Sequence, residues 1–316
     1  MPAIPAWSGL CMGNYRCSLS NMDKIPTQLD PPIDAVRRAV RIAIEEDLLP
    51  LGDVTASLIP PERTVRFYIK SRQEGIVAGR LCAIEAFIQV DSSIDVKWMI
   101  PDGGEVSNGS VVAEVSGNLR SILTAERTAL NFLCHLSGVA TLTSRFVARV
   151  KVPGSRAVVL DTRKTTPGLR ALEKAAIRAG GGRNHRGNLS EAILIKDNHL
   201  AGMSISEAVV AAHMNWPVKP VEVECDTVDQ AVEAQEAGAS MVLLDNMTPA
   251  EVGKCVELLD SLRSSGRVLV EVSGGININN VADYASAGAD FISVGALTHS
   301  VTALDLGLDV DGSVVV

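Results

Sequence analysis

Six short apolar runs in the second half of the chain end in residues that could do chemistry. The runs are AVVL, AILI, VEVE, MVLL, VLVEV and FISV, at positions 157–160, 192–195, 221–224, 241–244, 268–272 and 291–294. The residues at their ends are DTRK at 161–164, KDNH at 196–199, Glu224, Asp245 with Asn246, SGG at 273–275, and Gly295 with Ala296. If the runs are parallel strands of a barrel, all six ends meet on one rim, where barrel enzymes hold their active sites. We therefore predict one active site built from these ends.

Cations are concentrated in the first part of this region. Residues 161–199 contain eight Lys and Arg against four Asp and Glu, although the whole chain has a net charge of −8. Arginine binds carboxylates and phosphates through a two-pronged fork, and lysine supplies a compact charge. The cations at run ends or in the glycine-rich loop AGGGRNHR therefore predict an anion pocket; they are Arg163, Lys164, His185, Arg186 and Lys196.

Three other cations in the same segment have helical spacing. Arg170, Lys174 and Arg178 recur every four residues, so they lie on one face of a predicted helix. We expect this face to be solvated rather than part of the pocket.

The last two run ends are rich in glycine. Ser273, Gly274 and Gly275 follow the fifth run, and Gly295 follows the sixth. Backbone N–H groups in such turns can surround a phosphate, and late strands of barrels commonly hold one. The alternative is that these are only tight turns.

Two carboxylates stand among these groups. Glu224 and Asp245 could hold ribose hydroxyls or Mg²⁺, or they could only balance nearby arginines. Glu222 shares a strand face with Glu224, so one of the two could simply line the barrel. Together the predicted pocket suits a polyanion with phosphate, sugar hydroxyls and carboxylates, such as phosphoribosyl pyrophosphate with a dicarboxylate.

The elements that would position these residues alternate between strand-like runs and helix-like stretches after about residue 157. This alternation predicts a parallel α/β sheet, and the echo of AGASMVLLDN (237–246) in AGADFISVGA (287–296) indicates a repeated unit. A (β/α) barrel is favoured. A doubly wound open sheet is the competitor, although no GxGxxG follows the first strand.

The first half of the chain has a different pattern. Apolar spacing predicts helices at 32–49, 81–90 and 124–150, and short strands at 64–70, 74–79, 95–106 and 110–117. These elements predict an α+β layer that precedes the barrel.

Bulk composition limits the possible functions. Of the 316 residues, 47% are hydrophobic and only 3% aromatic, so aliphatic side chains must fill the core. The acidic balance disfavours a nucleic-acid partner, and no apolar run reaches the ~18–20 residues of a membrane helix. The six cysteines form no CxxC pair, which indicates reduced thiols and a cytoplasmic protein. Residues 1–24 are expected to be a disordered or leader segment.

Ten segments of the chain closely resemble the quinolinate phosphoribosyltransferase family, the carboxylating nicotinate-nucleotide pyrophosphorylases. They are GDVT (52–55), GIVAG (75–79), TAERTALNFLCHLSG (124–138), DTRKTTPGLR (161–170), GGGRNHR (180–186), IKDNH (195–199), VEVEC (221–225), LLDN (243–246), SGGI (273–276) and VGALTHS (294–300). The resemblance implies an N-terminal α/β sandwich, expected at 25–135, and an irregular seven-stranded α/β barrel, expected at 136–302, with a tail at about 303–316 that packs on the sandwich. It also implies a homodimer, or a larger homo-oligomer, with shared active sites.

The resemblance further implies the reaction and the role of each residue. Quinolinate and phosphoribosyl pyrophosphate would give nicotinate mononucleotide, pyrophosphate and CO₂, with Mg²⁺ as cofactor, a step of de novo NAD biosynthesis. Arg127 would reach the partner's pocket, and Arg163, Lys164, His185, Arg186 and Lys196 would bind quinolinate and pyrophosphate groups. Glu224 and Asp245 would hold the ribose hydroxyls and the metal, and with Lys164 and Lys196 they would form the catalytic set. Ser273, Gly274, Gly275 and Gly295 would hold the 5′-phosphate.

Two other functions remain open at this level. A relative that acts on nicotinate or another base would need fewer cations than this chain has. A non-catalytic barrel that binds a phosphorylated ligand would keep the glycine turns, but it would not need Arg127, Glu224 and Asp245 together. One departure from the family is Glu191, where the family often has Asp.

Overall fold

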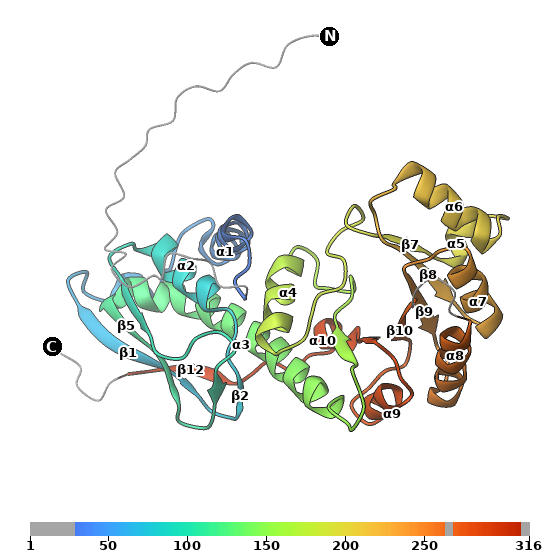
Figure 1. The fold of residues 1–316 in the computed structure, drawn as a ribbon. Coiled ribbons are helices and arrows are strands. Elements are labelled where there is room, and N and C mark those ends of the chain that lie inside the picture. Colours follow the sequence, from blue (N-terminus) through green and yellow to red (C-terminus); the bar gives the residue numbers. More distant parts are fainter. Residues whose placement is uncertain (1–28, 263–267, 311–316) are drawn as a thin grey trace, which may run out of the picture.

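A computed structural model of the chain describes residues 29–262 and 268–310, which form two lobes (Figure 1). The segment expected to be disordered or a leader, 1–24, lies outside the described residues. The first lobe contains an antiparallel sheet, and the second lobe contains a parallel sheet with helices on its outer side. The α+β layer and the parallel sheet expected from the sequence therefore both exist.

The sheet of the first lobe joins three strands from the first half of the chain to the last strand of the described chain. In spatial order its strands are β12 (Leu306–Val310), β1 (Thr64–Ser71), β5 (Val111–Asn118) and β3 (Asp95–Trp98). In β1 the alternate side chains of Val65, Phe67 and Ile69 are buried, because successive side chains of a strand point to opposite faces. Although β12 ends the described chain, it pairs antiparallel with β1, far back in the sequence.

Helices and short elements complete the first lobe. They are α1 (Ile33–Leu48), a 3₁₀ turn at Ala56–Leu58, α2 (Arg80–Val90), and a small ladder of β2 (Gly75–Ile76) with β4 (Glu105–Val106). The predicted helices at 32–49 and 81–90 are thus confirmed within one or two residues. They bury Val36 and Val40 from α1 and Phe87 from α2.

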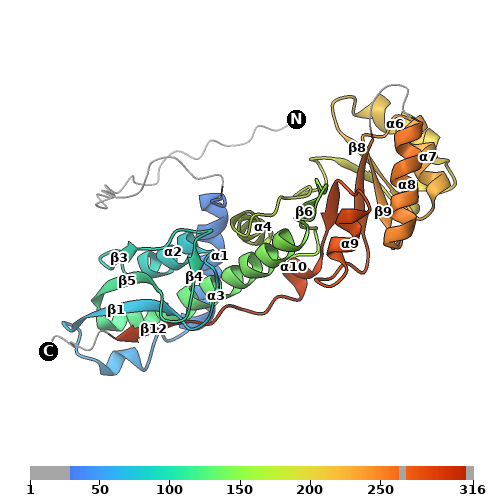
Figure 2. The ribbon, with the colours of Figure 1, turned by 60° about the horizontal axis from the view of Figure 1, so that its bottom comes forward.

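One long helix, α3 (Leu119–Arg149), crosses from the first lobe to the second (Figure 2). It begins five residues before the predicted start at 124, because the Asn118 side chain accepts a hydrogen bond from the Ser121 N–H and caps the helix. Near its middle, a Cβ on Gly138 would overlap the carbonyl oxygen of Thr302. This glycine therefore lets the chain pass close to α3 on its way back to β12.

All six apolar runs form strands of one parallel sheet in the second lobe. In spatial order they are β6 (Val158–Leu160), β11 (Phe291–Ser293), β10 (Leu269–Ser273), β9 (Met241–Asp245), β8 (Val221–Cys225) and β7 (Ile193–Ile195). From β7 to β11 consecutive strands are neighbours, and β6, the first strand, lies beside β11, the last. This cyclic order is that of a barrel interrupted between β6 and β7, whereas a doubly wound sheet would reverse its order at a switch point.

In the gap between β6 and β7, one isolated β-bridge is formed by a residue outside the named strands. Arg183 pairs in parallel with Leu160 of β6: its N–H donates to Val159 at 2.9 Å and its carbonyl accepts from Asp161 at 3.2 Å. Arg183 lies between β6 and β7 in the chain, where a seventh strand would belong. Among the described residues no ladder joins β7 to it, so the closed, seven-stranded barrel stays a prediction.

The helices of the second lobe begin and end at sequence signals. They are α4 (Arg170–Ala179), α5 (Asp197–Leu200), α6 (Ile205–Asn215), α7 (Val228–Glu236), α8 (Pro249–Ser261), α9 (Val281–Ser286) and α10 (Ala296–His299). Capping boxes open α6, α7 and α8. Gly238 and Gly288, with φ of 92° and 97°, follow α7 and α9 in the two Ala-Gly-Ala echoes, as expected of helix ends.

The described part of the chain contains no helix long and apolar enough to span a membrane.

Candidate active site

Three of the predicted site residues lie side by side at the carboxyl ends of neighbouring strands. Asp245 of β9 is directly paired with Ser273 of β10, and Glu224 is one residue before the end of β8. Parallel strands in register bring their carboxyl ends to the same edge, so the predicted rim exists on this side of the sheet. Asp245 is partly exposed and accepts a hydrogen bond from the Asn246 amide at 2.7 Å.

The structure joins Lys196 to this edge. Lys196 follows β7 directly, and its Nζ forms an ion pair with the Glu224 carboxylate. The pair is partly open to solvent, with side-chain exposures of 40% for Lys196 and 16% for Glu224. An anionic substrate could therefore reach Lys196 while Glu224 remains available to a hydroxyl or a metal ion.

Lys164 lies where the first and last strands of the sheet meet. Its carbonyl oxygen accepts a hydrogen bond from the Thr298 hydroxyl at 2.7 Å. A Cβ on Gly295 would lie 3.4 Å from Lys164 Cδ and 3.0 Å from His299 Nε2. The end of β11 therefore packs closely against the Lys164 side chain.

The glycine turn after β10 depends on its glycines. Gly274 and Gly275 have φ of 88° and 61°, in the left-handed region that side chains disfavour. A Cβ on Gly274 would also overlap the amide of Asn246, itself at φ 57°. This turn packs against the end of β9 too closely for a side chain at 274, which is the geometry of a backbone phosphate cradle or of a tight turn.

Arg163 and Arg186 form a pair of like charges. The Nε of Arg163 is buried and has no hydrogen-bond partner among the described residues. Burial lowers the pKa of Arg186, and the charge of Arg163 lowers it further. Arg186 uses one nitrogen to bind the Ala192 carbonyl at 3.1 Å. Two guanidinium groups whose charges influence each other, one with a buried unused donor, could bind a carboxylate or phosphate.

The prediction that the cations of α4 form a solvated face is wrong. They were expected on a solvated face, yet Lys174 is 7% exposed and donates to Asp161 Oδ1 at 2.5 Å and to the His185 carbonyl at 2.8 Å. Arg170 donates to the Gly187 carbonyl at 3.1 Å, and Arg178 to the Asn184 side chain at 2.6 Å.

This face of α4 is buried because the helix lies between α3 and the glycine-rich loop. The cations therefore hold the loop that carries the predicted pocket residues. One sequence signal pointed to this: Asp161 and Glu173 are two of only four acids in the basic segment. Both are fully buried.

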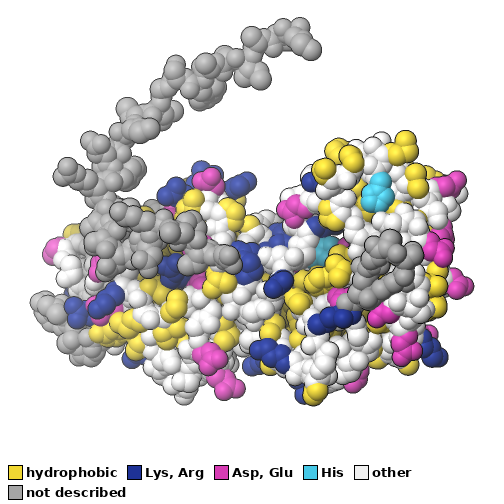
Figure 3. Space-filling model, viewed as in Figure 1, with side chains coloured by type: hydrophobic (Ala, Val, Ile, Leu, Met, Phe, Trp, Pro, Cys, Tyr) yellow, Lys and Arg dark blue, Asp and Glu magenta, His cyan; other side chains and the backbone are white. Residues whose placement is uncertain are grey.

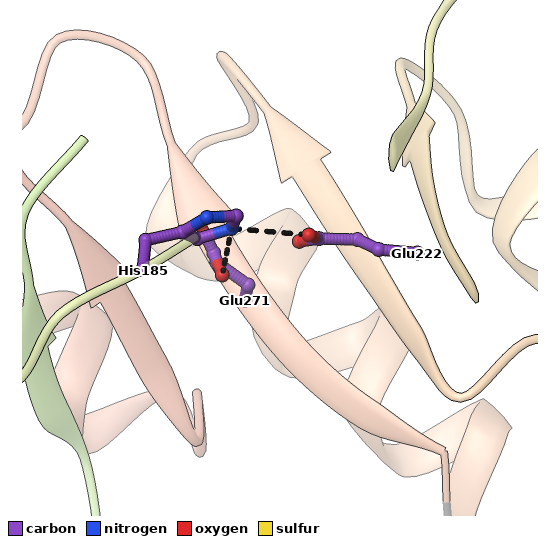
Figure 4. Close-up of side chains that lie close together, drawn as sticks. All are labelled: His185, Glu222 and Glu271. Carbon is purple, nitrogen blue, oxygen red and sulfur yellow. Dashed lines mark hydrogen bonds and ion pairs between the residues drawn. The ribbon is translucent and has the colours of Figure 1, made fainter. Parts of the chain in front are cut away.

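His185 points into the sheet interior, toward two glutamates (Figure 4). Its Nε2 lies 3.0 Å from Glu222 Oε2 and 3.4 Å from Glu271 Oε2, and its Nδ1 accepts the Arg186 N–H at 2.7 Å. Burial disfavours a charge on the ring, but the two glutamates outweigh it and raise the pKa of His185 to about 10. The glutamates thus hold a proton on Nε2, whereas a second proton on Nδ1 would face the Arg186 N–H, so this contact opposes the doubly protonated ring that the two carboxylates favour.

Glu222 lines the sheet interior, as one of the two β8 glutamates was expected to do. It is 2% exposed, and burial raises its pKa to about 7. Glu271 of β10 is fully buried and did not figure in the sequence analysis. It was missed because VLVEV resembles any buried apolar strand.

Arg127 does not lie at the strand ends with the other predicted site residues. It is exposed on α3, and the next residue, Thr128, binds Asp47 of α1 at 3.1 Å. It precedes His135 by two turns, about 12 Å along the axis at 1.5 Å per residue, and it is His135 that contacts Glu173 of α4. Within one chain, Arg127 therefore belongs to the first lobe.

Basic side chains gather on the surface between the two lobes, with a histidine beside them (Figure 3). Two cavities adjoin Arg186: one of about 230 Å³ also touches His185 and Glu222, and one of about 390 Å³ runs between β7 and α6. The smaller cavity reaches Pro220 and Met241, near the amino ends of β8 and β9. It therefore lies below the predicted rim rather than on it.

Known proteins resemble this chain over both lobes. The family profile "Quinolinate phosphoribosyl transferase, N-terminal domain" matches residues 53–137, and the corresponding C-terminal domain profile matches residues 139–309. The carboxylating nicotinate-nucleotide pyrophosphorylase of Mycobacterium leprae is 40% identical over 285 residues, which cover 89% of this chain and 99% of that protein. A probable enzyme of the same name from Methanothermobacter thermautotrophicus is 40% identical over 284 residues, with 89% and 99% coverage.

The fold comparison gives the same result. The solved nicotinate-nucleotide pyrophosphorylase of Francisella tularensis superposes with a TM-score of 0.84 at 39% identity, covering 90% of this chain and 99% of that one. Similarity over both lobes, at this identity, is that of proteins with common descent. The chain belongs to the quinolinate phosphoribosyl transferase family.

Proposed function

We propose that this protein transfers the phosphoribosyl group of phosphoribosyl pyrophosphate to quinolinate, and that loss of CO₂ then gives nicotinate mononucleotide and pyrophosphate. Membership of the family supports this reaction. The observation that carries it for this chain is the Arg163–Arg186 pair, with its buried and unused Nε. A dicarboxylate supplies two anionic groups, which would relieve the repulsion between two guanidinium groups.

The carboxylates suit the sugar half of the reaction. Departure of pyrophosphate leaves positive charge on the ribose carbon, and fixed carboxylates next to that carbon stabilise this charge. Glu224 and Asp245 lie on adjacent strand ends, and Lys196 beside them could bind an anionic group. The arginines would hold the ring nitrogen of quinolinate in line with the same carbon.

Glu224 and Asp245 also fit a magnesium ion, because their carboxylate oxygens are hard ligands at neighbouring strand ends and Asp245 is partly exposed. Bound Mg²⁺ would neutralise charge on the pyrophosphate leaving group. The turns at Ser273–Gly275 and Gly295 would hold the 5′-phosphate through backbone N–H groups.

We also propose a homodimer in which Arg127 of one subunit completes the pocket of the other. Its exposure on the first lobe, two helical turns before the contact between α3 and α4, supports this arrangement. A cytoplasmic location fits the four described cysteines, which are free thiols.

Initial rates with quinolinate and with nicotinate, each with phosphoribosyl pyrophosphate and Mg²⁺, test the proposed function. We expect nicotinate mononucleotide from quinolinate with one CO₂ released per product, and little turnover of nicotinate. Faster turnover of nicotinate would identify a relative acting on that base. Tight binding of phosphoribosyl pyrophosphate without turnover of either base would identify a binding protein.

A further inference from the structure

Three polar side chains meet inside the parallel sheet, below the predicted pocket. Glu222 on β8 and Glu271 on β10 are almost fully buried, and both point at the His185 ring (Figure 4). Burying a carboxylate is unfavourable unless it is paired. Glu271 has no hydrogen-bond partner among the described residues, so its contact with the ring at 3.4 Å is what offsets its burial.

Every polar group of His185 is engaged within the protein. Its N–H donates to Asp161 Oδ1 at 2.8 Å, and its carbonyl accepts from Lys174 Nζ at 2.8 Å. Its Nε2 faces the two glutamates, and its Nδ1 accepts the Arg186 N–H at 2.7 Å. The backbone of Arg186 is thus hydrogen-bonded to a ring that Glu222 and Glu271 contact on its other side.

We propose that Glu222 and Glu271 are positioning residues: together they fix the His185 ring and, through its Nδ1, the backbone of Arg186, so that the Arg186 guanidinium stands beside Arg163. The expected effect on quinolinate binding rests on the proposed function, because Arg186 is a predicted contact of quinolinate. The structural chain from glutamate to ring to backbone can be tested without any substrate.

The alternative is a metal ion held by the same three side chains, whose ligand atoms lie within 4.8 Å of one another. The geometry disfavours it. Since Nδ1 accepts an N–H, the ring proton belongs on Nε2, the atom that would have to bind the metal.

The test uses Glu271→Gln, which keeps the size of the side chain and removes its charge. Asp102→Asn is the control, because Asp102 is a partly buried acid of the first lobe that accepts the Gly79 and Arg80 N–H groups and has no contact with His185 among those described. Circular dichroism and thermal unfolding show whether each variant is folded. Glu222→Gln is the second variant if Glu271→Gln does not fold.

The first readout is hydrogen exchange of peptides covering residues 184–187, measured by mass spectrometry in the free protein. We expect exchange at least about tenfold faster in Glu271→Gln, because removing the carboxylate charge weakens the contact that holds the His185 ring. Asp102→Asn should leave these peptides unchanged. Equal exchange in Glu271→Gln and wild type would overturn the proposal, and so would a stoichiometric metal ion in wild type that Glu271→Gln lacks.

The second readout is a double-mutant cycle on quinolinate binding by calorimetry. Glu271→Gln should lower the affinity for quinolinate about tenfold and leave the affinity for phosphoribosyl pyrophosphate within twofold of wild type. The effect on quinolinate should vanish in an Arg186→Ala background. An effect that persists without Arg186 would mean that Glu271 does not act through it. If wild type does not bind quinolinate at all, the proposed function fails, while the exchange experiment still decides the positioning role.

Discussion

Burial and the charge of Arg163 disfavour the charge of Arg186 in the free protein, and an anionic substrate would relieve that repulsion. The buried Nε of Arg163 adds a donor that no described protein group uses. Both features would give the arginine pair a larger role in binding than exposed surface cations, whose interactions water screens.

Replacement of Arg163 by alanine should therefore weaken the reaction specifically. We expect kcat/KM for quinolinate to fall by the factor that corresponds to a loss of about 1.5–3 kcal/mol, the range for a hydrogen bond to a charged group. Thermal stability should change little. Arg38→Ala, at an exposed arginine of α1, is the control and should behave as wild type. Unchanged quinolinate kinetics in Arg163→Ala would show that Arg163 is not in the pocket.

Asp245 separates an enzyme from a binding protein. Its charge matters most when the sugar becomes cationic, so Asp245→Asn should lower kcat and kcat/KM together, by roughly 10²-fold as for other electrostatic contacts to a transition state. Affinity for phosphoribosyl pyrophosphate should change only modestly. Rates combined with active-site titration provide the measurement, and full occupancy with normal turnover would remove Asp245 from the catalytic set.

At the scale of elements, α4 connects the two lobes to the pocket loop. Its buried residues include Glu173, which contacts His135 of α3 at 2.9 Å, and Lys174, which holds Asp161 and His185. A buried ion pair is strongly destabilising when one partner is removed. The position of the loop that carries His185 and Arg186 therefore depends on α4 packing against α3.

The start of α2 offers a pH-dependent test of stability. Asp102 accepts the N–H groups of Gly79 and Arg80 at 3.2 and 3.1 Å, and burial raises its pKa from 3.8 to about 6. Between pH 4 and 6 the folded protein keeps this proton while the unfolded chain loses it. The contribution of Asp102 to the free energy of unfolding therefore falls as pH rises through that window.

Asp102→Asn lacks this titration. The free energy of unfolding of the variant minus that of wild type should rise from pH 4 to 6 and stay level above pH 6. Denaturant unfolding at a series of pH values measures the difference. A difference independent of pH would mean that Asp102 titrates normally in the folded protein.

At the scale of the whole molecule, Arg127 and the pocket belong to different lobes of one chain. If Arg127 completes the pocket of a partner, two inactive variants should complement each other. Mixing Arg127→Ala with Lys196→Ala under subunit exchange should regenerate up to about a quarter of the wild-type activity, because random exchange gives half mixed dimers and each holds one intact site. No recovery after exchange is demonstrated would contradict a shared site.

Local patterns of the sequence were enough for the six strands, the helices between them and the rim formed by Glu224, Asp245 and Ser273. A buried parallel strand appears in the sequence as a run of apolar residues. Strands in one parallel sheet all have their carboxyl ends at the same edge. The anion pocket stays a prediction, and it has a similar origin, because a basic segment in an acidic chain stands out by composition alone.

Only the tertiary structure decided which charged residues are buried. Spacing places Lys174 on one face of a helix but does not say whether water or Asp161 lies against that face. Likewise, Glu271 becomes a partner of His185 only because β8 and β10 flank β9 and both turn a glutamate inward under the loop. Such contacts join residues far apart in the chain, and their burial depends on how whole elements pack, which no local pattern encodes.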